Sequence, residues 1–189
     1  MIQLSLCLVA VAATALGLFV WRSRPENVVN RWFAAFTLSG AGWVLGVAGL
    51  HGGVHLTAWG GFTFASASLI PATFLRFAHA YPTAAHWPSV TWTRTIFSLG
   101  VAFSLLSLTT PLIIYEPVMT AQGLTRKSGH LYPLFALYFI VTWSMALGMC
   151  LYKWRQARGQ ERVRLQYLIA AVLLSGAGAI SLKRILTTS

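Results

Sequence analysis

The chain has 189 residues, of which 57% are hydrophobic and only 9% are charged, and its mean hydropathy is +0.67. Soluble domains carry roughly a quarter charged residues, so this composition excludes an ordinary water-soluble domain. It predicts an all-α polytopic membrane helix bundle. The net charge of +11 comes from cations placed between apolar runs, a distribution typical of cytoplasmic loops and not of a nucleic-acid-binding surface.

Apolar runs separated by short polar segments predict six membrane-spanning helices in one transmembrane domain, residues 1–189. The first run is not a signal peptide, because its first cation, Arg22, follows the apolar residues instead of preceding them. We therefore expect the N-terminus to lie outside. The spans are predicted at about 2–21, 32–50, 57–80, 95–114, 131–152 and 165–182.

The second and sixth predicted helices share a run of small residues. Ser-Gly-Ala-Gly occurs at 39–42 and again at 175–178. The recurrence fits a parallel internal repeat, and it also fits the ordinary enrichment of small residues where membrane helices touch. Close helix packing is therefore predicted at Gly42, Gly46, Ser175, Gly176 and Gly178.

The third predicted helix contains a proline, Pro71, which should kink it, and a polar pair near its inner end. Arg76 and His79 are three residues apart and so share one helix face. One interpretation is a polar switch that couples an outer signal inward. The other is an interfacial anchor in which Arg76 extends toward the lipid headgroups.

A basic segment, Lys153 to Arg164, separates the fifth and sixth predicted helices, and its only acid is Glu161. We predict a loop here that stays on the cytoplasmic side and fixes the orientation of the chain. With this orientation, ten of the 14 Lys and Arg residues lie inside. The topology-setting cations are Lys153, Arg155, Arg158, Arg162 and Arg164.

Six spans leave Lys183 and Arg184 on the outer side together with the C-terminus. Return to the inside would need a seventh span. We therefore expect the sequence to be part of a longer protein or a shortened relative.

Signatures of catalysis and cofactor binding are missing from the sequence. It contains no HExxH, GxSxG, P-loop or CxxC motif and no Asp, and its three Glu residues fall outside the predicted spans. His51, His55 and His130 are all assigned to the outer side, where solvated loop histidines are favoured over a metal or pH-sensing site. We predict no catalytic residue, metal or cofactor.

Three stretches together resemble the N-terminal seven-span sensor region of bacterial membrane histidine kinases. They are Asn-Arg-Trp-Phe-Ala at 30–34, Phe-Leu-Arg-Phe-Ala-His-Ala-Tyr-Pro at 74–82, and Gly-Gln-Glu-Arg-Val-Arg-Leu-Gln-Tyr-Leu at 159–168. The resemblance implies a sensing or docking module in the bacterial cytoplasmic membrane, followed by a cytoplasmic kinase. These residues lack the seventh span, a phospho-accepting histidine box and an ATP-binding domain, so kinase activity is not expected of them.

The predicted function is therefore a non-catalytic sensor module of a two-component system. Its mechanism would be a shift in helix packing, passed through Arg76, His79 and the basic segment. The expected partners are the lipid bilayer and either other membrane subunits or a second copy of the chain. The alternative is a structural or accessory subunit of a larger respiratory or photosynthetic membrane complex. Missing intramembrane carboxylates weigh against a transporter or channel.

Overall fold

The computed structural model describes residues 2–85, 87–120 and 123–187, with the side chains of 116–127 and 175–187 outside the description. The described chain is a helix bundle with one small β-hairpin, which confirms the predicted fold class. The elements are α1 (Ile2–Ser23), α2 (Val28–His51), α3 (Leu56–Ala80), α4 (Val90–Thr109), β1 (Ile114–Thr120), β2 (Gly123–Ser128), α5 (Tyr132–Gln156) and α6 (Gly159–Thr187).

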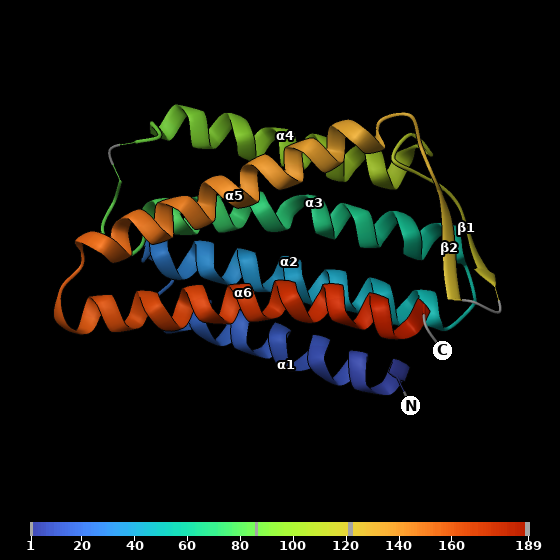
Figure 1. The fold of residues 1–189 in the computed structure, drawn as a ribbon, viewed down its shortest axis with the longest axis horizontal. Helices are drawn as coiled ribbons and strands as arrows, with labels where there is room; N and C mark the ends of the chain where they lie inside the picture. Colours follow the sequence, from blue (N-terminus) through green and yellow to red (C-terminus); the bar gives the residue numbers. More distant parts are fainter. Residues whose placement is uncertain (1, 86, 121–122, 188–189) are drawn as a thin grey trace.

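Successive helices run in opposite directions, so their connections gather at two ends of the bundle (Figure 1). We call one end the basic end. It holds the connections 24–27, 81–89 and 157–158 together with the helix termini that they join. The opposite end holds the α2–α3 turn, the β-hairpin and the start of α1, and we call it the hairpin end (Figure 1).

Side-chain caps fix where two of the helices begin at the basic end. The Asn27 side chain accepts a hydrogen bond from the Val29 amide at 2.9 Å and so starts α2. Ser89 caps α4 in the same way by accepting from the Trp92 amide. This cap places the start of α4 at Val90, five residues before the predicted start of the fourth span at 95.

α3 is the central helix, and it packs against α2, α4, α5 and β1. Its buried residues include many hydroxyl-bearing side chains, which donate to carbonyls of their own helix. The Ser68 hydroxyl, for example, donates to the Phe64 carbonyl at 2.7 Å. Toward the basic end the side chains become large and apolar, and Phe74, Leu75 and Phe77 form one cluster with residues of α5 and α6. The structure has α3 continuing as one helix through Pro71.

Glycines on α2 allow it to approach α3 closely. A Cβ added to Gly46 would lie 2.9 Å from the Thr63 Cα, and one added to Gly42 would lie 2.8 Å from the Ser66 Oγ. Gly49, which the sequence analysis did not select, faces the Trp59 ring in the same way. Ser175, Gly176 and Gly178 lie in α6 where side chains are not described, so their predicted packing stays a prediction.

Two segments that the sequence predicts as loops are structured. Most of the segment 115–130 belongs to the antiparallel strands β1 and β2, and β1 begins one residue earlier, where Ile114 pairs with Ser128. Its β-branched and aromatic residues favour a strand, and the buried Ile113 and Ile114 anchor the hairpin to the helices.

The prediction that Lys153 to Arg164 form a loop is also wrong, because most of this segment is helical. α5 continues to Gln156 and α6 begins at Gly159, which leaves only Ala157 and Arg158 as the connection. Lys, Arg, Gln and Glu are good helix formers, so both helices extend into the polar segment. Gly159 adopts a positive φ of 59°, which makes the reversal possible between them.

Within the described residues, α1, α2 and α5 are long and apolar enough to cross a membrane. α3 is largely buried among the other helices and contains several Gly, Ser and Thr residues. Large side chains are exposed on the outer helices, and Phe19 of α1 and Ile140 of α5 are 72% and 62% exposed. Such apolar surface is typical of contact with lipid. A total of six spans remains a prediction.

The close approach of α2 and α3 predicts that Gly46→Ala destabilises the bundle by about 1–3 kcal/mol, because the new methyl group forces the two backbones apart. Gly40→Ala is the matched control on the same helix, since an added Cβ there meets nothing within 4 Å. Thermal unfolding of the purified protein in detergent measures both. Equal melting temperatures for the two variants would contradict the tight contact.

Candidate functional site at the basic end

The Lys153 ammonium holds the end of α3. Its Nζ donates to the carbonyl oxygens of Ala78 at 2.7 Å, His79 at 3.0 Å, Tyr81 at 2.8 Å and Thr83 at 2.7 Å. An ammonium has three N–H donors, so at least two of these four oxygens share one hydrogen. One side chain of α5 therefore fixes the path of the chain as it leaves α3.

This contact has a clear physical cause. The last carbonyls of an α-helix have no partner within the helix, and the C-terminal end carries a partial negative charge. A cation from a neighbouring helix can donate hydrogen bonds to these carbonyls and also offset the partial negative charge. Within the described residues Lys153 is bonded only to carbonyl oxygens, and no carboxylate is involved. In the sequence Lys153 is one of five topology-setting cations. Its contact with α3 is recognisable only when the fold places the end of α3 beside α5.

Arg76 connects α3 to α4 and α2. Its Nη1 donates to the Thr93 hydroxyl at 2.9 Å, and its guanidinium lies over the Trp32 ring, 4.5 Å from the ring centroid. The Thr93 hydroxyl is fixed in turn because it donates to the Val90 carbonyl at 2.9 Å. Two protein groups, the Thr93 hydroxyl and the Trp32 ring, therefore hold the Arg76 guanidinium.

His79 lies one helical turn after Arg76 in α3 and contacts the connection between α3 and α4. Its Nε2 is 3.0 Å from the Pro88 carbonyl oxygen, so Nε2 carries the hydrogen and donates it. The His79 side chain is buried, at 8% exposure. Arg76 and His79 thus both join the end of α3 to the α3–α4 connection or the first turn of α4. In the described part of the chain each hydrogen-bonds to a residue outside α3.

The other cations of the basic segment are exposed. Arg162 lies over the Trp154 ring at 5.2 Å from its centroid. Arg155 and Arg158 are exposed to the surroundings of the bundle, and Arg164 lines a pocket. The Trp154 indole Nε1 is buried and has no hydrogen-bond partner among the described residues.

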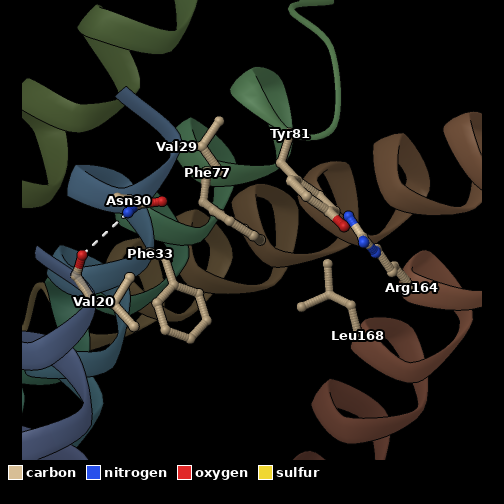
Figure 2. Close-up of a pocket in the computed structure, with 8 residues that line it drawn as sticks. All are labelled: Val20, Val29, Asn30, Phe33, Phe77, Tyr81, Arg164 and Leu168. Atoms are coloured by element: carbon tan, nitrogen blue, oxygen red, sulfur yellow. Dashed lines mark hydrogen bonds between the residues drawn. The ribbon is translucent and has the colours of Figure 1, made fainter. Parts of the chain in front are cut away.

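The pocket beside Arg164 has a volume of about 360 Å³ and lies where α1, α2, α3 and α6 meet (Figure 2). On its α2 side the Asn30 amide donates to the Val20 carbonyl at 3.1 Å and so satisfies a terminal carbonyl of α1. On its α6 side the Arg164 guanidinium lies next to the Tyr81 hydroxyl (Figure 2). The lining residues are Val20, Val29, Asn30, Phe33, Phe77, Tyr81, Arg164 and Leu168.

Tyr81 supplies a neutral hydroxyl to this pocket. Burial raises the pKa of the Tyr81 phenol above its ordinary value, and the Arg164 cation opposes that effect only in part. Its ring stacks on Phe77 with centroids 5.3 Å apart, which fixes the direction of the hydroxyl. Tyr81 is therefore a protonated donor at neutral pH.

The described part of the chain contains no group of three His, Cys, Asp or Glu side chains that could hold a metal. His51 instead contacts the Val47 carbonyl of its own helix through Nδ1 at 2.9 Å. The arrangement at the basic end consists of cations, carbonyls and aromatic rings. The cations can bind anions, and their contacts with carbonyls and rings position the helices.

Residues 5–186 match the model of the family described as the N-terminal 7TM region of histidine kinase. The chain belongs to this family. The match confirms the resemblance inferred from the three sequence stretches, and it identifies the bundle as a membrane region of the histidine kinase type. No curated protein and no solved structure matches the chain.

The role of Lys153 leads to a prediction for this 7TM region. Lys153→Met should destabilise it by about 2 kcal/mol or more, because the carbonyls at the end of α3 lose a charged donor. Arg155→Met is the matched control, since it removes one cation from the same exposed segment and leaves the α3 contact intact. Thermal unfolding in detergent distinguishes the two, and equal melting temperatures would show that Lys153 acts only through its charge.

Proposed function

We propose that this 7TM region is a non-catalytic sensor and docking module of a histidine kinase in the bacterial cytoplasmic membrane. A signal received in the membrane or at the hairpin end would change how the helices pack at the basic end. That change would then be passed to a kinase on the cytoplasmic side. The region itself would carry out no covalent chemistry.

The observation that carries this proposal is the set of polar contacts around the end of α3. Lys153 joins α3 to α5, Arg76 joins it to α4 and α2, and His79 joins it to the α3–α4 connection. Such contacts are directional, so a small displacement of one helix breaks them instead of deforming them gradually. The end of α3 therefore has the properties that a two-state element needs.

The orientation of the region supports the same proposal. Cations are concentrated in the helix ends and connections of the basic end, and the positive-inside rule assigns such an end to the cytoplasm. Trp21, Trp87 and Trp92 lie near this end and are 47%, 77% and 66% exposed. Exposed tryptophans of this kind are typical of the headgroup layer. A kinase that follows the region would face the same compartment.

A test of signalling uses Arg76→Ala and Thr93→Val, each of which removes one partner of the α3–α4 contact. In the full histidine kinase reconstituted into vesicles, each should change the autophosphorylation rate by about fivefold or more. The double variant should add little to either change, because both act on one contact. Arg94→Ala and Thr91→Val are exposed controls in α4. Rates for Arg76→Ala that equal those for Arg94→Ala would contradict the proposal.

The orientation is tested by chemical labelling. Gln160→Cys, in a background with Cys7→Ser and Cys150→Ala, should resist a membrane-impermeant thiol reagent added to intact cells. Val54→Cys, an exposed position in the α2–α3 turn, should react readily. Both should react after the membrane is permeabilised. Labelling of position 160 in intact cells would reverse the orientation and remove the basis for a cytoplasmic output.

A further inference from the structure

The pocket beside Arg164 combines a mostly apolar lining with polar groups on one side. Phe33, Phe77 and Leu168 supply apolar wall from three different helices (Figure 2). Arg164 and Tyr81 place a guanidinium and a hydroxyl next to each other at the α6 side (Figure 2). This is the combination that an amphiphilic anion requires, with a charged head and an apolar tail.

The Arg164 charge is not neutralised within the described chain. Glu26 and Glu161 are the two acids whose side chains the structure describes, and neither forms an ion pair with Arg164 there. Glu161 lies one turn before Arg164 in α6 and acts electrostatically on Tyr81, so its effect on a bound anion is repulsive. The chain as a whole carries a net charge of +11, and Glu26 and Glu161 are too few to offset the cations of the basic end.

The depth of the pocket in the membrane identifies the source of the anion. Val20 lines the pocket, and the next residue, Trp21, is exposed at the end of α1. Together with Trp87 and Trp92 it marks the headgroup layer of the leaflet at the basic end. The pocket therefore opens where phospholipid headgroups lie, and anionic phospholipids are the anions concentrated at that surface.

We infer that this pocket binds one anionic phospholipid, with its phosphate on Arg164 and Tyr81 and the upper part of one acyl chain against Phe33 and Leu168. A volume of about 360 Å³ is near the lower limit of ligand pockets, so the rest of the lipid stays in the bilayer. The lipid joins α6 to the packed helices α1, α2 and α3. This inference rests on the proposed function, in which the basic end faces the headgroups of the cytoplasmic leaflet and its helix packing carries the signal.

The test measures lipid retention and involves no kinase assay. The full chain, purified in detergent, is titrated with phosphatidylglycerol or with phosphatidylcholine of identical acyl chains, and bound lipids are counted by native mass spectrometry. We expect one tightly retained phosphatidylglycerol and no equivalent phosphatidylcholine. Arg164→Gln should lower that retention roughly tenfold relative to Arg158→Gln, because only Arg164 forms charge-assisted hydrogen bonds with the phosphate.

Two further variants separate the pocket from diffuse attraction. Glu161→Gln should raise phosphatidylglycerol retention because it removes the nearby carboxylate. Leu168→Trp should lower retention by filling the apolar wall, with an unchanged far-ultraviolet circular dichroism spectrum confirming the fold.

Several outcomes would overturn the inference. Equal losses for Arg164→Gln and Arg158→Gln would show diffuse attraction only, and equal retention of the two lipids would show a purely apolar groove. Retention of added oleate in place of phosphatidylglycerol would assign the pocket to a free fatty acid. Failure of these lipid measurements leaves the Arg76 and Thr93 signalling test unaffected, so the two proposals fail separately.

Discussion

A single ammonium group determines how the end of the central helix is held. Lys153 of α5 donates to carbonyls of Ala78, His79, Tyr81 and Thr83, and so neutralises the negative end of α3. The chain has only three acids against 14 Lys and Arg residues, so carboxylates cannot serve as partners for most cations. Backbone carbonyls and aromatic rings take their place. A helix end and a cation are therefore complementary where Lys153 meets α3.

The position of α3 explains its unusual composition. A helix that is surrounded by α2, α4 and α5 does not contact lipid along most of its surface, so it tolerates Gly, Ser and Thr. Its hydroxyls return hydrogen bonds to its own carbonyls, which keeps buried polar groups satisfied. Small residues also allow close approach, as at the contact of Gly46 with Thr63. Movement of α3 would consequently change its packing against three neighbouring helices at once.

The pocket beside Arg164 and the contacts around α3 lie at the same end of the bundle. Tyr81 belongs to both, since its carbonyl accepts from Lys153 and its hydroxyl faces Arg164. Occupation of the pocket would therefore act on the residue that ends α3. The proposed function needs such a connection between the lipid pocket and the basic end. The shared tyrosine offers a short physical path for it.

The sequence alone determined the helical membrane class, the family and the approximate helix positions, because hydropathy and charge placement are local properties of the chain. It also selected Arg76 and His79, whose polarity is unusual in an apolar run. Only the tertiary structure decided their partners, the β-hairpin and the role of Lys153. A lysine at a helix end is the same in sequence whether it faces water or four carbonyls. The difference arises from residues 70 or more positions away, which the fold alone brings together.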